Sequence, residues 1–179
     1  MISISEVMTT APADERVPLE KEVYKILDSL QIPYERVDND TVSSMAECIE
    51  INKVLGAEIR KSIFLCNSKK TSFYLLIMPA EKPFDTGVFS NAVGCSRVSF
   101  AKEEYMLKHL GVTPGSATIM GLINDKDDFV QLIIDKEVAD AEWFCCNPGA
   151  NTSHLKIKTR LLLDKFLPHI YHRARVVEL

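Results

Sequence analysis

The segment KSIFLCNSKKTSFYLLIM, residues 61–78, holds two apolar runs on either side of a short polar stretch. The runs Ser62–Cys66 and Ser72–Met78 have the length of β-strands and are rich in aromatic and branched residues. The polar stretch Asn67–Lys70 is typical of a turn. Two such runs joined by a short turn predict a β-hairpin, which we place at the centre of the fold.

Helical and extended patterns alternate on both sides of this hairpin. Helices are expected over Val17–Gln31, Ser44–Glu58, Phe84–Val93, Lys102–Leu110 and Thr159–Leu167. Strands are expected over Tyr34–Asp38, Arg97–Phe100, Leu122–Asn124, Phe129–Asp135, Glu142–Cys146, Leu155–Ile157 and Ala174–Glu178. This interspersed order predicts an α+β fold with a mixed, largely antiparallel sheet. No linker or repeat interrupts the pattern, so we expect a single domain.

The composition is that of one globular unit. The chain has 179 residues, 46% of them hydrophobic, and a single core is normal at this length. It has no run of about 18 apolar residues, as a transmembrane helix requires, so no membrane partner is expected. Residues 1–18 lack the positive start and apolar run of a signal peptide, which favours a cytoplasmic location.

The net charge of −4 argues against a protein that coats nucleic acid nonspecifically, and no DNA partner is expected. The charge is uneven along the chain, however. Residues 1–50 contain four Lys or Arg against eleven Asp or Glu, whereas residues 155–179 contain six against two. The basic C-terminal stretch fits local contact with RNA phosphates and, equally, a solvated helix face.

Five cysteines occur, an odd number, without a secretion signal. This pattern favours reduced thiols in a cytosolic protein. Cys145 and Cys146, followed by His154, form the one sequence cluster that suits a redox or metal role. It lacks a C-x-x-C pair, and adjacent residues of a strand point to opposite faces of the sheet. Zinc is therefore the least favoured of these roles.

The acidic stretch Asp125–Asp128 raises the question of calcium, because carboxylates are the usual ligands of this ion. An EF-hand loop also needs a central Gly and a late Glu, and both are missing here. A plain turn between two strands is the favoured interpretation.

Standard catalytic and nucleotide-binding motifs are absent from the sequence, but three places suit a binding site. Lys61, at the start of the hairpin, suits a phosphate contact, or a simple contact with the dipole of the preceding helix. The glycines in 111–116 and 121–125 let a ligand approach the backbone, although such residues also make ordinary turns. The polar loop 147–152 suits either binding or a plain connection.

These places together resemble the YbaK/prolyl-tRNA-synthetase-associated editing domain family. The resemblance is carried by an ordered series of short stretches: Lys61–Leu65, Phe73–Pro79, Arg97–Ala101, Leu110–Ser116, Gly121–Lys126, and Asn151–Thr152 before Leu155–Ile157. No single stretch is highly specific, but their order is. The resemblance covers residues 18–179 and leaves residues 1–17 as an N-terminal extension.

The resemblance implies a hydrolase of translation fidelity, without metal or cofactor, that removes alanine mischarged onto proline tRNA. It also implies a partly closed, barrel-like sheet flanked by helices. Lys61 matches the family lysine that binds and orients the terminal adenosine of the RNA. Backbone N–H groups near Gly115 would polarise the ester carbonyl, while the ribose hydroxyl assists attack by water.

Further positions match the substrate-binding part of the family: Ser62, Ser116, Gly121, Asn147, Asn151 and Thr152. The implied partner is the acceptor end of mischarged tRNA, and prolyl-tRNA synthetase is a further candidate. A small pocket would admit alanine and exclude proline.

Two departures from the family pattern keep other readings open. The family usually has a Gly-x-x-x-Pro loop, but Ile119 stands four residues after Gly115. The family commonly has His before Pro in the late loop, where this chain has Asn147, which does not titrate near neutral pH. A non-catalytic tRNA-binding or regulatory relative is therefore one alternative. A thiol-linked interaction module using Cys145 or Cys146 is another.

The absence of spaced Cys and His ligands predicts that the purified protein carries no stoichiometric metal. Elemental analysis of the protein should find well below one zinc per chain. About one zinc per chain would contradict this prediction and favour the thiol-centred alternative.

Overall fold

The computed structural model describes residues 2–42 and 44–179, so Met1 of the predicted extension and Ser43 of the predicted domain lie outside the described residues. The strands are β1 Tyr34–Asp38, β2 Lys61–Asn67, β3 Phe73–Met78, β4 Val98–Phe100, β5 Val130–Asp135, β6 Trp143–Cys146, β7 Ser153–Lys158 and β8 Ala174–Val177. The helices are α1 Pro18–Ser29, α2 Cys48–Leu55, α3 Thr86–Val93, α4 Glu103–Leu110, η1 Ile119–Asn124, α5 Lys136–Asp140, α6 Thr159–Leu161, η2 Leu162–Phe166 and α7 Leu167–His169. None of these helices combines the length and the apolar character needed to cross a membrane.

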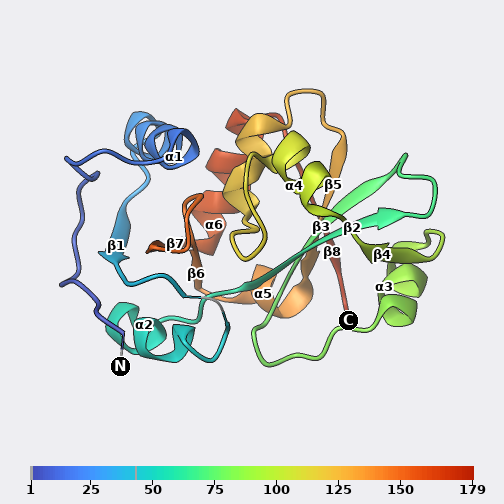
Figure 1. Cartoon of the computed structure of the whole chain (residues 1–179), viewed down its shortest axis with the longest axis horizontal. Coiled ribbons are helices and arrows are strands. Elements are labelled where there is room, and N and C mark those ends of the chain that lie inside the picture. Colours follow the sequence, from blue (N-terminus) through green and yellow to red (C-terminus); the bar gives the residue numbers. More distant parts are fainter. Residues whose placement is uncertain (1, 43) are drawn as a thin grey trace.

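The predicted hairpin is confirmed and forms the middle of a five-stranded sheet in the order β4-β2-β3-β5-β8 (Figure 1). β2 and β3 are antiparallel, with Ile63 opposite Leu76, and β4 is antiparallel to β2. β5 and β8 add in parallel on the other side. Every residue of β3 is buried, which explains why its sequence is apolar throughout instead of alternating.

A second, three-stranded sheet has the order β1-β7-β6 and is wholly antiparallel. The two sheets meet at one bridge, between Ile59 and Cys145, supported by a 2.9 Å hydrogen bond from the Arg60 N–H to the Cys145 carbonyl. The α+β fold with mixed sheets is thus confirmed. The implied barrel-like closure is wrong for the described strands, because a junction one bridge long does not continue as a ladder around the molecule.

Three apolar clusters hold these layers together. The largest lies between the two sheets and receives α1, α4, η1 and the helical segment from Thr159 to His169. A second cluster packs α3 against the opposite face of the five-stranded sheet. The third packs α2 against the outer face of the three-stranded sheet, around Val37 and Cys145. Because the largest cluster draws on both sheets, the chain forms a single domain.

The predicted strand Leu122–Asn124 is wrong, because these residues belong to the 3₁₀ helix η1. The Thr118 hydroxyl accepts a hydrogen bond from the Met120 N–H at 3.3 Å and caps this helix. Gly121 then donates to the Thr118 carbonyl at 3.1 Å. A short apolar run has the same hydrophobic pattern in a buried helix as in a buried strand, so the sequence alone did not separate them.

The second predicted helix is confirmed, but it is shorter than the expected Ser44–Glu58. Its capping box is present, since the Ser44 N–H donates to the Glu47 carboxylate at 3.0 Å and the Glu47 N–H to the Ser44 hydroxyl at 3.4 Å. Regular helix begins only at Cys48 and ends at Leu55, before Gly56, whose φ of 65° favours glycine. This early end leaves residues 57–60 free to approach the three-stranded sheet.

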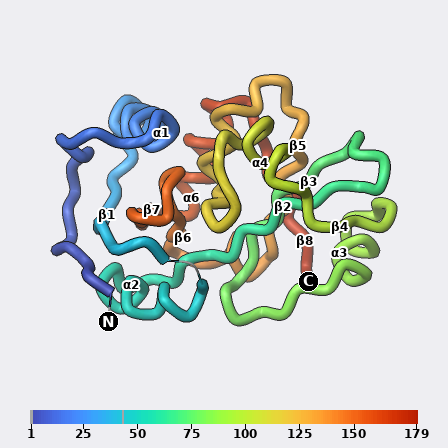
Figure 2. Tube along the Cα trace, viewed as in Figure 1, coloured from blue at the N-terminus to red at the C-terminus, as the bar shows by residue number. Residues whose placement is uncertain are grey.

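The N-terminal segment runs along the outside of the molecule between α2 and α1 (Figure 2). It pairs with β1 through an isolated bridge from Met8 to Arg36, and with the residue after β1 through one from Ile4 to Asn39. Arg16 fixes its end through ion pairs with Asp38 at 2.8 Å and with the buried Glu20 at 3.2 Å. The segment is thus packed against the domain, while the predicted boundary at residues 17 and 18 stays a prediction.

Gly121→Ala should destabilise the fold. A Cβ at Gly121 would lie 2.8 Å from Leu110 Cβ and 3.0 Å from the Leu110 carbonyl oxygen, where η1 packs on α4. Overpacking of this kind costs about 1–3 kcal/mol in the free energy of unfolding, which urea denaturation would measure. Gly87→Ala is the matched control, because its Cβ would meet only Asp85 Oδ1, at 3.1 Å. Equal stability of both variants would contradict this account of the η1–α4 contact.

Candidate functional site

A cavity of about 240 Å³ lies beside the junction of the two sheets. It brings together four segments that are distant in sequence: the stretch before α2, the start of β2, the loop before η1, and the loop between β6 and β7. Five of the predicted site residues line it: Lys61, Ser62, Gly115, Asn147 and Asn151. The remaining wall consists of Val42, Ser44, Met45, Cys48, Ile59, Arg60, Ala117 and His154.

Lys61 is the first residue of β2, opposite Met78 of β3. Its Nζ donates a hydrogen bond of 2.6 Å to the Lys82 carbonyl, which anchors the side chain at the rim of the sheet. Lys82 is itself held by ion pairs to Asp135 at 3.0 Å and Glu137 at 2.6 Å. An ammonium group has three donors, so an anchored Lys61 still has two for an anionic ligand.

Gly115 lies in a tight turn with φ of 87°, a conformation that favours glycine. The Ser116 N–H donates to the Thr113 carbonyl at 3.0 Å, so this amide is committed to the turn. A Cβ at Gly115 would lie 3.8 Å from Asn151 Nδ2, which shows how closely the two loops approach. The bare backbone of Gly115 therefore forms part of the cavity wall.

Asn147 is mainly occupied in holding the loops in place. Its Oδ1 accepts from the Gly149 N–H at 3.0 Å, and its Nδ2 donates to the Ala117 carbonyl at 3.4 Å. Its own carbonyl accepts from the Thr118 hydroxyl at 2.7 Å. These contacts join the loop 147–152 to the loop before η1.

Asn151 ties the late loop to the segment before α2. Its Nδ2 donates to the Val42 carbonyl at 2.8 Å, and its carbonyl accepts from Asn39 Nδ2 at 3.0 Å. The neighbouring Thr152 is exposed, and its carbonyl accepts from the Asn39 N–H at 2.9 Å. Thr152 thus takes part in the scaffold through its backbone.

The other two predicted site residues lie elsewhere. Ser116 is buried and lines a neighbouring depression of about 650 Å³, between the start of α1 and the end of α4. Gly121 is packed inside η1 against Leu110. The smaller cavity is the candidate site because Lys61 and a histidine both line it.

His154 also lines this cavity, although the sequence pattern indicated it only beside the cysteines. His154 lies in β7 opposite Val37 of β1, and its side chain is 2% exposed. Burial lowers the pKa of His154 to about 4, so the ring is neutral at physiological pH. Strand alternation places His154 on the same face as Lys156 and away from Leu155, a signal that was available in the sequence.

The departure from the family pattern at Ile119 has a local structural replacement. Ile119 occupies the first position of η1, where proline is favoured, and it is fully buried in the largest cluster. With the Thr118 cap, its burial fixes the loop that carries Gly115. The loop geometry therefore does not depend on a proline.

The cysteine pair does not have the exposure that the thiol-linked alternative requires. Cys146 faces the cluster between the sheets and Cys145 faces α2, as strand alternation predicted. Burial raises the pKa of Cys145 to about 12 and also raises that of Cys146. Both thiols are therefore protonated and unreactive at neutral pH.

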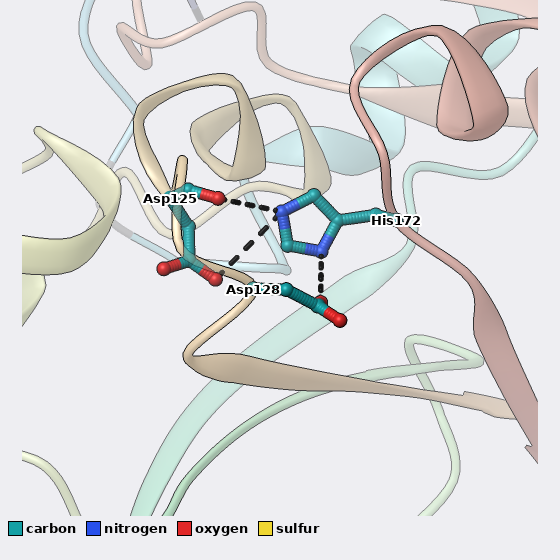
Figure 3. Close-up of side chains that lie close together, drawn as sticks. All are labelled: Asp125, Asp128 and His172. Carbon is teal, nitrogen blue, oxygen red and sulfur yellow. Dashed lines mark hydrogen bonds and ion pairs between the residues drawn. The ribbon is translucent and has the colours of Figure 1, made fainter.

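The acidic turn contacts a histidine from the end of the chain (Figure 3). Asp125, Asp128 and buried His172 are close enough to share a cation. His172 Nδ1, however, lies 3.1 Å from Asp128 Oδ1, and Nε2 lies 3.0 Å from the Asp125 carbonyl. Both carboxylate oxygens of Asp125 accept hydrogen bonds from backbone N–H groups, Oδ1 from Phe129 at 3.1 Å and Oδ2 from Val130 at 2.8 Å. These contacts fit a turn that is tied to the segment before β8.

Three basic residues of the C-terminal stretch have partners within the domain. The side chain of Lys156 is buried and donates to the Leu55 carbonyl at 2.7 Å. Lys158 pairs with Glu142, and Arg160 with Asp164 at 3.2 Å. Half of the six basic residues are therefore already compensated within the domain.

Residues 39–165 match the family model of the aminoacyl-tRNA editing domain. The chain belongs to this family. The match includes all the residues that line the cavity, and it confirms the prediction of an aminoacyl-tRNA editing enzyme, a hydrolase. A relative, the prolyl-tRNA editing protein ProX of Acetoanaerobium sticklandii, is 27% identical over 127 residues, which cover 71% of this chain and 77% of ProX.

Two solved structures share the fold of this editing domain. One is a proposed trans-editing enzyme for prolyl-tRNA synthetase, with a TM-score of 0.64 and 16% identity over 92% of this chain and 99% of that chain. The other is a hypothetical protein, with a TM-score of 0.66 and 14% identity over 88% and 98%. At this level of identity they establish the α+β architecture.

The buried His154 should make stability depend on pH. Above pH 6.5 the ring is neutral in both states. Between pH 6.5 and about 4 the unfolded chain binds a proton that the folded protein excludes. The free energy of unfolding therefore decreases as the pH is lowered through this range. The contribution is on the order of 1–3 kcal/mol. His154→Asn should flatten this part of a urea-denaturation series, while His169→Asn, at an exposed site, should not.

Parallel pH profiles for the wild type and His154→Asn would contradict this prediction. His109 is also buried, and burial together with Lys108 lowers its pKa. His109 therefore lowers stability at acidic pH in the same way. For this reason the test is the difference between the wild type and His154→Asn, and not the absolute slope of the free energy of unfolding against pH.

Proposed function

We propose that this editing domain acts in trans and hydrolyses the ester of alanyl-tRNA(Pro). The observation that carries the proposal is the convergence of Lys61, Gly115 and Asn151 on one small cavity. The relative ProX, a prolyl-tRNA editing protein by name, supports proline tRNA as the acceptor. Residues 18–179 would form the editing domain and residues 1–17 the extension, in a cytoplasmic protein.

The size and lining of the cavity support a small aminoacyl group. Its volume of about 240 Å³ is below the roughly 300–1,000 Å³ of pockets for drug-sized ligands. Val42, Met45 and Cys48 give it an apolar wall toward α2. A methyl side chain suits such a wall, whereas the ring of proline requires more room and displacement of packed residues.

Lys61 would hold the 3′ end of the RNA. Its ammonium, anchored by the Lys82 carbonyl, is a fixed positive charge at the cavity rim. A phosphate of the terminal nucleotide would meet this charge and place the ester between β2 and the Gly115 loop. In this role the lysine supplies charge and position and transfers no proton.

The ester would be cleaved by water with the help of the substrate. Water adds to the carbonyl carbon, the bond from that carbon to the ribose oxygen breaks, and the ribose oxygen takes up a proton. The neighbouring ribose hydroxyl assists the attack, so no protein nucleophile is required. A backbone N–H of the Gly115 loop other than that of Ser116 would polarise the carbonyl. The acceptor end would be delivered free or by prolyl-tRNA synthetase.

Lys61→Ala should reduce deacylation of alanyl-tRNA(Pro) by roughly ten- to a hundredfold, because a charge-assisted contact is lost. The melting temperature should change little. Lys69→Ala, in the exposed hairpin turn, is the control and should match the wild type in both measurements. A tRNA whose terminal ribose lacks the assisting hydroxyl should not be hydrolysed even by the wild type.

Equal rates for the wild type and Lys61→Ala would disprove the role of this lysine. A panel of mischarged tRNAs tests the substrate. If the wild type hydrolyses a different aminoacyl-tRNA and not alanyl-tRNA(Pro), that substrate is the correct one and alanine is wrong. If the wild type hydrolyses none of the panel, the protein is a non-catalytic relative.

A further inference from the structure

His154 presents a defined hydrogen-bonding edge to the cavity. The side chain lines the cavity together with Lys61 and Asn147 and is 2% exposed. Its Nδ1 lies 2.9 Å from Asn39 Oδ1. With Nδ1 occupied by this bond, Nε2 is the polar atom of the ring that remains for a ligand in the cavity.

The hydrogen bonds of Asn39 determine which ring nitrogen carries the proton. Asn39 Nδ2 donates to two carbonyl oxygens, those of Asp40 at 2.8 Å and Asn151 at 3.0 Å. This fixes the orientation of the amide, so Asn39 Oδ1 must be an acceptor. Nδ1 of His154 therefore donates, and Nε2 of the neutral ring is an unprotonated acceptor.

The other charged groups at the cavity make such an acceptor useful. Lys61 and Arg60 are both cations, and Arg60 is held by Glu58 at 2.5 Å and by the Trp143 carbonyl at 3.1 Å. An aminoacyl ester carries an α-ammonium group, which these cations repel. It needs an acceptor in the cavity. Asn147 Oδ1 already accepts from the Gly149 N–H at 3.0 Å, whereas Nε2 of His154 has no hydrogen-bond partner among the described residues.

We infer that Nε2 of His154 accepts a hydrogen bond from the α-ammonium group of the aminoacyl ester. His154 is thus a recognition residue that selects esters of amino acids and orients the carbonyl toward the Gly115 loop. The low pKa of His154 agrees with this role, because a protonated ring could only donate. The inference rests on the proposed deacylase function of this cavity.

The role of His154 can be tested by comparing two substrates and two variants. Wild type, His154→Asn and His154→Gln would each be assayed for kcat/KM on alanyl-tRNA(Pro) and on propionyl-tRNA(Pro), which lacks only the amino group. An Asn side chain retains the donor to Asn39 but has no atom at the position of Nε2. A Gln side chain reaches the Nε2 position and offers an acceptor oxygen there.

The α-ammonium group also activates the ester toward water by itself, so the preferences of the variants are compared. We expect the wild type to prefer the alanyl ester about ten- to a hundredfold more strongly than His154→Asn does, the typical effect of a charge-assisted hydrogen bond. His154→Asn should lose this part of the preference by slowing on the alanyl ester alone, and His154→Gln should restore some of it. A merely structural role would slow both substrates equally, so the ratio isolates the contact with the ammonium group.

No preference in the wild type, or an unchanged preference in His154→Asn, would overturn the inference while the deacylase function stands. Hydrolysis of neither ester by the wild type would overturn both proposals. Melting temperatures of the variants verify that the compared proteins are folded.

Discussion

The hydrogen bond from the Arg60 N–H to the Cys145 carbonyl fixes the point where the chain, coming from α2, touches the three-stranded sheet and enters the five-stranded one. Lys61 follows at once as the first residue of β2, so its position relative to β6 is set by backbone contacts. The loops before η1 and after β6 then close over the same point. A charged side chain next to a sheet junction is held more precisely than one on a free loop, because the backbone on both sides is paired.

The cluster between the sheets makes this junction rigid. It contains residues of both sheets, of α1 and of the C-terminal helical segment, so neither sheet can tilt without opening a packed interior. The N-terminal segment adds pairing along the outer edge of β1, which leaves fewer unpaired backbone groups there. The elements that surround the cavity are therefore fixed from several directions.

The loops of the site are shaped by polar side chains that bond to backbone groups. Asn39, Asn147 and Asn151 each bridge two segments, and Thr118 caps η1 while it binds the Asn147 carbonyl. Such loops have no ladder or helix to satisfy their backbone groups, so side chains supply the partners. This explains how the site keeps its shape although Ile119 and Asn147 depart from the family pattern. Lys61 and His154, for which we propose contacts with the substrate, are instead anchored by one side-chain hydrogen bond each.

The sequence by itself determined the central hairpin, most helices and strands, and the family, since these follow from local apolar periodicity, turn residues and the order of short motifs. It also indicated Lys61, Gly115 and Asn151, which the cavity brings together. The sequence did not determine the helical state of residues 122–124, the separation into two sheets, or the place of His154. Those depend on which faces are buried against distant segments and on the Asn39–His154 bond across 115 residues, and only the tertiary structure decides such contacts.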